Sequence, residues 1–301
     1  MSFQIKLFQN PSEDSNVLEI SNATTSAKID LNKGASIQSL TLDSVPIIKE
    51  LSSLISENTF ASSILFPFAN RIKGGKYIFN TRTYQTEINQ VEENNALHGF
   101  VYDKEFQLVK QQTTNSNASV ILEYNETEFT KGFPFTYKIQ VEYTLTKHSL
   151  ELKVRVENTS ENEFPFTLGW HPYFYSADLN KSILKFKSSK QVVFDETMIP
   201  IGTCKITNSQ NFELKNKKLD DCFYLDANLV EFVTPAYCFQ LTSSEKENFL
   251  QIYTPKVKNT IAIEPTTGIS NSFNTEIGLK KLLPKETYRV TWKLNLRNFF
   301  I

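Results

Sequence analysis

Apolar and polar residues alternate along several stretches of the chain, most clearly over residues 137–145. There every odd position is apolar and every even position is polar. A period of two is typical of a strand with one buried face. The alternation resumes over 150–157 after a short polar segment at 147–149, so the two strands are expected to pair as a long antiparallel hairpin.

The same alternation covers residues 288–296 near the end of the chain. Helical periodicity is weak, and short turns are expected only near residues 48–55 and 274–282. Many strands at short spacing predict an all-β fold, a sandwich of large antiparallel sheets. No repeat or Pro/Gly/Ser-rich linker divides the chain, so residues 1–301 are expected to form a single domain. Shorter alternating stretches cover residues 3–8, 25–31, 37–42, 105–110, 119–124 and 249–253.

The charge and composition of the chain indicate which kinds of partner and location to expect. Thirty-two basic and 33 acidic residues give a formal net charge of −1, which favours neither a nucleic acid nor an anionic membrane as a partner. The chain shows no signal peptide and no apolar stretch of membrane-spanning length, so a cytoplasmic protein is expected. Three cysteines without CxxC spacing are interpreted as reduced thiols, and no metal site is expected.

Histidine is scarce, with three residues in the chain, so each one is informative. His148 lies in the polar turn of the long hairpin and is expected to be solvated. His98 precedes Gly99, which permits close backbone approach, and it either faces a ligand or is hydrogen-bonded within a buried loop. His171 lies in the aromatic segment 168–174, where a buried imidazole needs a partner; a ligand site is favoured over a core histidine.

Three further residues are candidates for chemistry or binding. Glu264 ends an apolar strand, where a partly desolvated carboxylate has a raised pKa and can serve as a general base; a carboxylate bonded to nearby backbone N–H groups is the alternative. Asn70 and Arg71 lie in an apolar flank. A forked guanidinium there needs an acceptor, either a structural carboxylate or the vicinal hydroxyls of a substrate.

Taken together and in order, these segments resemble the aldose 1-epimerase (galactose mutarotase) family over essentially the whole chain. The resemblance rests on several weak motifs that occur in the family's order. Among them, residues 219–223 are similar to the family's sugar-binding aspartate motif, and residues 251–254 are similar to its glutamine motif. The motifs are Asn-Arg-Ile at 70–72, Asn-Ala-Leu-His-Gly-Phe at 95–100, Gly-Trp-His-Pro-Tyr-Phe at 169–174, Leu-Asp-Asp-Cys-Phe at 219–223, Gln-Ile-Tyr-Thr at 251–254 and Glu-Pro-Thr-Thr at 264–267.

The resemblance implies a galactose mutarotase-like β-sandwich that interconverts the anomers of a free aldohexose without a cofactor. Glu264 would be the base and His171 the acid, and His98 would act beside them. The remaining family positions imply sugar-binding roles for Asn70, Arg71, Asp220 and Gln251, and whether Asp220 or Asp221 contacts the sugar is left open. A monomer or homodimer with a small sugar as its partner is expected.

The sequence leaves two alternatives to a free-sugar mutarotase open. A hexose 6-phosphate mutarotase would need extra cations at the site, for which Arg82, Lys73 and Lys76 lie near the motifs. A non-catalytic carbohydrate-binding protein would keep the fold and lose an acid or base. The chain also has His-Gly-Phe and His-Pro-Tyr-Phe where the best-known galactose mutarotases tend to have His-Gly-Gly and His-Thr-Tyr-Phe, which indicates a divergent branch.

Overall fold

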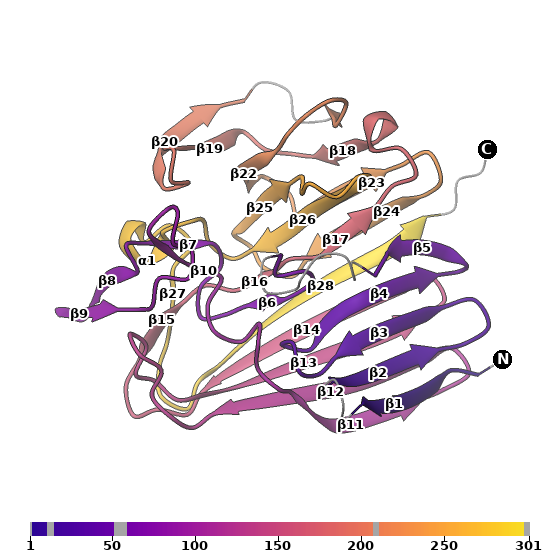
Figure 1. Ribbon diagram of the computed structural model, residues 1–301, viewed down its shortest axis with the longest axis horizontal. Coiled ribbons are helices and arrows are strands. Elements are labelled where there is room, and N and C mark those ends of the chain that lie inside the picture. The colour runs from indigo at the N-terminus through magenta and orange to yellow at the C-terminus, as the bar shows by residue number, and fades with distance from the viewer. Residues whose placement is uncertain (1, 11–14, 51–58, 207–210, 298–301) are drawn as a thin grey trace.

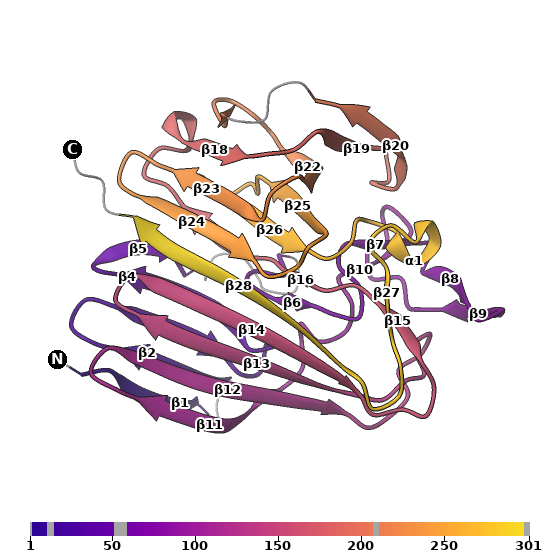
Figure 2. The same ribbon diagram turned by 180° about the vertical axis from the view of Figure 1, so that it is seen from behind.

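The computed structural model describes residues 2–10, 15–50, 59–206 and 211–297 (Figure 1). Nearly all of the regular structure in these residues is β, and the large sheets are antiparallel, which confirms the predicted fold class. A nine-stranded sheet forms one layer, and the five-stranded and eight-stranded sheets both lie over the same face of it, as the two views show (Figures 1 and 2).

The nine-stranded sheet contains the three long strands that the alternation predicted. Its order is β11 (Gln107–Thr113), β12 (Asn117–Glu126), β13 (Tyr137–Thr146), β14 (Ser149–Asn158), β28 (Thr287–Arg297), β24 (Cys238–Ser243), β23 (Leu229–Val233), β18 (Ile183–Phe186) and β21 (Phe212–Glu213).

The facing layer has two parts. The first is a five-stranded meander of β1 (Gln4–Asn10), β2 (Ser15–Ser21), β3 (Ser26–Asp30), β4 (Ser36–Leu42) and β5 (Val45–Ile48). The second is an eight-stranded sheet in the order β20 (Pro200–Lys205), β19 (Lys190–Phe194), β22 (Asp220–Leu225), β25 (Asn248–Tyr253), β26 (Thr260–Thr266), β16 (Gly169–Trp170) and β6 (Ile64–Leu65), with β17 (Tyr173–Tyr175) also paired to β26.

Short elements complete the described part of the chain. The pairs are β7 (Arg71–Lys73) with β10 (Asn95–Leu97), β8 (Lys76–Phe79) with β9 (Arg82–Gln85), and β15 (Phe164–Phe166) with β27 (Lys280–Leu282). The helices among the described residues are a single 3₁₀ turn, η2 (Leu179–Lys181), and a single α turn, α1 (Ser272–Thr275).

The core follows from the alternation along the strands. On β13 buried and half-buried residues alternate over its whole length, so its apolar side chains face the second layer. By contrast, β26 is buried at every position, as expected of a central strand covered on both faces. The main apolar cluster contains residues from Phe3 to Leu296 and therefore joins both ends of the described chain.

The two expected turns have different outcomes. Residues 51–55 of the segment near 48–55 lie outside the described residues, and its first residue, Ile48, ends strand β5. In the segment near 274–282, α1 supplies one helical turn at its start. Its last residues, Lys280–Leu282, instead form strand β27, because they pair with β15 at the edge of the sandwich. The prediction of a turn there was wrong for that part.

Candidate active site

The register of three neighbouring strands places several polar and aromatic side chains on one face of the eight-stranded sheet. Gln251 on β25 pairs with Glu264 on β26, and Tyr253 pairs with Asp220 on β22. Tyr173 on β17 pairs with Ala262, two residues from Glu264. Because side chains alternate across a strand, Asp220, Tyr253, Gln251, Glu264 and Tyr173 share a face. This face forms the floor of a cavity of about 500 Å³.

His171 and Glu264 are in direct contact on this floor. The Nε2 atom of His171 lies 3.3 Å from Oε1 of Glu264, and both side chains are almost completely buried. The ring of His171 also stacks on Tyr173, with centroids 4.9 Å apart. The structure therefore brings together a carboxyl group and an imidazole that the sequence identified separately.

Burial controls the protonation of this pair. Desolvation lowers the pKa of His171 to about 3. Desolvation also raises the pKa of Glu264 well above its ordinary value, and the nearby Asp220 raises it further. Both shifts favour the uncharged forms, so the pair favours the state in which the carboxyl group keeps its proton and the imidazole is neutral.

His98 lies beside the pair in a backbone conformation that fixes its ring. Its φ is +65°, and its backbone N–H donates to the Asn70 carbonyl at 2.9 Å. The backbone N–H of Asn70 in turn donates to Nδ1 of His98 at 3.3 Å, so Nδ1 is the acceptor and Nε2 carries the proton. Burial, followed by the neighbouring His171 and Arg71, lowers the pKa of His98 well below its usual range. His98 is thus a neutral hydrogen-bond donor through Nε2.

The four expected sugar-binding residues form one chain of hydrogen bonds along the cavity wall. Arg71 Nη1 donates to Asn70 Oδ1 at 2.9 Å, and Asn70 Nδ2 donates to Gln251 Oε1 at 3.4 Å. Gln251 Nε2 then donates to Asp220 Oδ1 at 2.6 Å. Each donor fixes the orientation of the next amide, so all three hydrogen bonds point the same way, from the guanidinium toward the carboxylate.

The choice between Asp220 and Asp221 follows from strand alternation. Asp220 lines the cavity, and desolvation raises its pKa to about 6. Asp221 is one residue further along β22 and therefore points to the opposite face, where Oδ1 accepts from Gln191 Nε2 at 2.6 Å. Asp220 is the carboxylate positioned to contact a ligand in this cavity.

Residues 86–94, between β9 and β10, form one side of the cavity and carry a residue that the sequence analysis missed. Glu93 accepts from Arg71 Nε at 2.5 Å and from Nη2 at 3.1 Å, a bidentate ion pair. This carboxylate is the acceptor that the buried guanidinium required. The side chain of Asn89 binds both the N–H and the carbonyl of Leu97, which holds the segment against β10. Phe60, Tyr173 and Tyr253 add aromatic walls that sequence reasoning did not single out as contacts.

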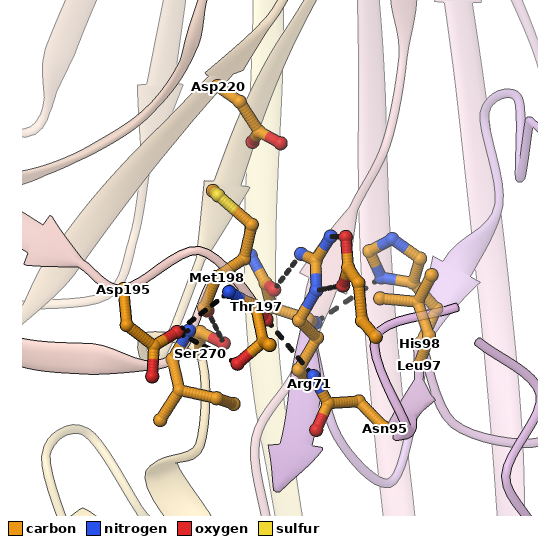
Figure 3. Close-up of polar contacts among 12 residues, drawn as sticks. Arg71, Asn95, Leu97, His98, Asp195, Thr197, Met198, Asp220 and Ser270 are labelled. Carbon is orange, nitrogen blue, oxygen red and sulfur yellow. Dashed lines mark hydrogen bonds and ion pairs between the residues drawn. The ribbon is translucent and has the colours of Figure 1, made fainter. Parts of the chain in front are cut away.

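The β19–β20 turn, residues 195–199, is tied to the elements around the site. Asn95 Nδ2 donates to the Thr197 carbonyl at 3.0 Å, and Ser270 Oγ donates to the Met198 carbonyl at 2.9 Å. The carboxylate of Asp195 accepts from backbone N–H groups within the turn. In the view of Figure 3, Arg71 lies between this turn and His98. These bonds connect the edge of the eight-stranded sheet to β10 and to the segment that precedes α1.

Other residues considered from the sequence lie away from the cavity. Lys73, Lys76 and Arg82 are exposed and do not line it. His148 is half-exposed in its hairpin turn, with Nδ1 3.6 Å from Asp43 Oδ2, as predicted for a solvated histidine. The three cysteines are free thiols.

The described residues contain neither a cluster of metal-ligating side chains nor a membrane-spanning helix. No group of three or more His, Cys, Asp or Glu side chains is arranged to hold a metal ion there. In the same part of the chain, no helix is both long enough and apolar enough to cross a membrane.

Known proteins share both the fold and the sequence family of this chain. A galactose mutarotase-like protein from Clostridium acetobutylicum superposes with a TM-score of 0.87 at 21% identity, covering 99% of each chain. The fold is therefore a galactose mutarotase-like β-sandwich. A family model described as aldose 1-epimerase matches residues 16–295, and the chain belongs to that family.

Two curated relatives also match, at low identity. The Escherichia coli protein YihR is 22% identical over 243 residues, which cover 77% of this chain and 77% of that protein. Galactose mutarotase of Rattus norvegicus is 25% identical over 171 residues, which cover 55% of this chain and 48% of that protein. This low identity fits a divergent branch, as the departures in the histidine motifs indicated. Membership of the family supports a mutarotase-type function.

Proposed function

We propose that this protein is an aldose 1-epimerase that interconverts the α and β anomers of a free aldohexose by acid/base ring opening, without a cofactor. The observation that carries the proposal is the 3.3 Å contact between His171 Nε2 and Glu264 Oε1 on the floor of a cavity that can enclose one sugar ring. A base and an acid one hydrogen-bond length apart can reach two oxygens attached to the same carbon, which is what the anomeric centre presents.

In the proposed reaction Glu264 takes the proton from the C1 hydroxyl. The bond between C1 and the ring oxygen breaks, its electron pair goes to the ring oxygen, and His171 donates a proton to that oxygen. The product is the open-chain aldehyde. Rotation about the C1–C2 bond followed by closure gives the other anomer, with the two groups exchanging roles. Each positioned acid or base group contributes about 10²- to 10⁴-fold in rate.

The proton balance of the pair suits this cycle. The resting form, a neutral Glu264 and a neutral His171, contains the same single proton as the reactive form, a carboxylate and an imidazolium. Transfer along the existing 3.3 Å contact converts one into the other. Hydroxyl donors from a bound sugar stabilise the carboxylate and so favour the reactive form. No proton has to come from solvent at any step.

The other cavity residues have binding roles in this proposal. His98 donates from Nε2 to a sugar oxygen near the anomeric centre, because its Nδ1 already accepts from Asn70. Asp220 and Gln251 bind hydroxyls farther from C1, and Asn70 and Arg71 hold the ring between these groups. Tyr173 and Tyr253 present aromatic surfaces to the apolar C–H faces of the sugar.

The alternatives are less well supported. A hexose 6-phosphate substrate calls for cations, and Arg71 is the one Lys or Arg among the described residues that line the cavity. A non-catalytic sugar-binding protein would not need an acid and a base in contact. We also infer that residues 1–301 act as one domain, because one apolar cluster includes residues from both ends of the described chain.

Anomeric exchange by NMR tests the proposal across substrates. Saturation of the α-anomer H1 signal of glucose, galactose, mannose or xylose should transfer to the β signal in the presence of the protein, for at least one free aldose. The residue-level test is the variant Arg71→Ala, which should raise KM more than it lowers kcat. Absence of accelerated exchange for every aldose would refute the mutarotase assignment.

A further inference from the structure

The charged side chains that line the cavity are mostly acidic. Glu92, Glu93 and Asp220 line it with three carboxyl groups, against the single guanidinium of Arg71 in the described lining. The His171–Glu264 pair is neutral as a unit when it holds one proton. The cavity is therefore acidic at neutral pH, although it contains an arginine.

The bidentate edge of Arg71 already binds a carboxylate of the protein. Arg71 binds the two oxygens of Glu93 through Nε and Nη2, and it binds Asn70 Oδ1 through Nη1. The Nε–Nη2 edge is the fork that would otherwise hold a phosphate or carboxylate in bidentate fashion. Glu93 thus occupies that edge and neutralises the charge. The side chains of Arg71 and Glu93 are 10% and 22% exposed, so solvent screens the pair only partly.

Glu93 lies in the segment 86–94, and the hydrogen bonds that hold this segment do not involve the Glu93 side chain. Gln90 and Asn95 exchange two backbone hydrogen bonds, and Asn89 binds Leu97 through both atoms of its amide. Replacement of Glu93 by glutamine therefore leaves the backbone of residues 86–94 supported. The substitution also leaves the hydrogen bond from Gln251 to Asp220 intact.

We propose that Glu93 determines specificity by occupying the bidentate edge of Arg71, so that the cavity accepts uncharged aldoses and rejects sugars that carry a phosphate or carboxylate. The inference rests on the proposed mutarotase function and deepens it by naming the residue that restricts the substrate to uncharged sugars. Through Arg71, Glu93 also acts as a positioning residue, because the guanidinium it holds orients the Asn70 amide and, through it, Gln251. A phosphate carries a charge of about −1.5 to −2 at neutral pH, so repulsion by Glu92 and Asp220, the acidic lining residues outside the Arg71–Glu93 ion pair, opposes its entry.

The test compares kcat and KM for α-D-glucose and α-D-glucose 6-phosphate in the native protein, Glu93→Gln and Glu93→Asp. The native protein should prefer glucose in kcat/KM. Glu93→Gln should shift that preference toward the phosphate by about 10- to 100-fold, mainly through a lower KM for the phosphate. Glu93→Asp keeps the charge and should retain the native preference. The matched control is Glu87→Gln, which removes an equal charge from the same segment at an exposed site outside the cavity lining.

A second readout does not depend on turnover. Inorganic phosphate titrated calorimetrically should bind Glu93→Gln at least about 10-fold more tightly than the native protein or Glu87→Gln. A native protein that turns over glucose 6-phosphate as well as glucose would overturn the inference, as would equal phosphate affinity in all variants. If no sugar is turned over, the proposed function fails, and the phosphate titration still decides the role of Glu93 by itself.

Discussion

His171 lies opposite Glu264 because of the register of β26 with the two short strands on either side of the histidine. Gly169 pairs with Thr266, and Tyr173 pairs with Ala262, so His171 falls midway between these pairings and faces Glu264. The contact is therefore set by backbone pairing in the centre of a buried sheet, which holds the two groups more rigidly than a loop would.

The pH dependence of kcat follows from the opposite pKa shifts of these two residues. Burial lowers the pKa of His171 to about 3 and raises that of Glu264 well above its ordinary value. The pair therefore favours its uncharged form from about pH 3 up to the raised pKa of Glu264. We predict that kcat is nearly constant between pH 5 and 7, roughly, and falls only in more alkaline solution. A kcat that titrates like an ordinary histidine, near pH 6.5, would contradict this protonation scheme.

Asp220 should couple stability to pH. Desolvation raises its pKa from 3.8 to about 6, so the folded state binds this proton more tightly than the unfolded state does. The resulting stabilisation is fully present below pH 3.8 and is lost as the pH rises through about 6. Asp220→Asn should therefore be more stable than the native protein by about 2–3 kcal/mol at pH 8, with no gain at pH 3.5.

Urea unfolding at the two pH values measures this difference. The control is Asp195→Asn, because backbone and side-chain hydrogen bonds from the β19–β20 turn lower the pKa of Asp195. The sign is then reversed: the native carboxylate stabilises the fold above its unfolded pKa, and the asparagine variant should be less stable at pH 8. Equal stability of Asp220→Asn and the native protein at pH 8 would show that Asp220 is not desolvated.

Gly99 allows the chain that carries His98 to pass close to Phe66. A Cβ on Gly99 would lie 2.1 Å from the Phe66 carbonyl oxygen, and the φ of Gly99 is +75°. Gly99→Ala should lower the free energy of unfolding by about 2–4 kcal/mol and weaken sugar binding by displacing His98. Gly74→Ala is the matched control, because Gly74 has a φ of +59° but open space around its Cβ position. It should lose only about 1 kcal/mol. Similar losses in both variants would mean that the close approach to Phe66 is unimportant.

The sequence predicted strands with one buried face better than strands that are buried on both faces. Strands β13, β14 and β28 have one buried face, so their alternation is visible in the sequence. Strand β26 is buried on both faces and shows a run of apolar residues without alternation. The two-residue strands β6 and β16 are too short for any periodic signal, and they exist only because distant segments pair with them.

The sequence identified most of the site residues one by one, but it did not show which of them contact each other. The choice between Asp220 and Asp221 depends on which face of β22 each residue occupies, and two adjacent aspartates carry no pattern that decides it. Glu93 was missed as the partner of Arg71 because its pairing depends on how residues 86–94 return to β7. The one available signal was the requirement that a buried guanidinium have an acceptor, which identified the need but not the residue.

The most direct test of the central claim is polarimetry of freshly dissolved α-D-glucose and α-D-galactose with the native protein and with Glu264→Gln. The glutamine keeps the size of the side chain and can still form a hydrogen bond with His171 Nε2, and circular dichroism would check that the variant is folded. We predict accelerated relaxation with the native protein for at least one sugar, reduced by about 10²-fold or more in Glu264→Gln. Undiminished acceleration by the folded variant would contradict the assignment of Glu264 as the base.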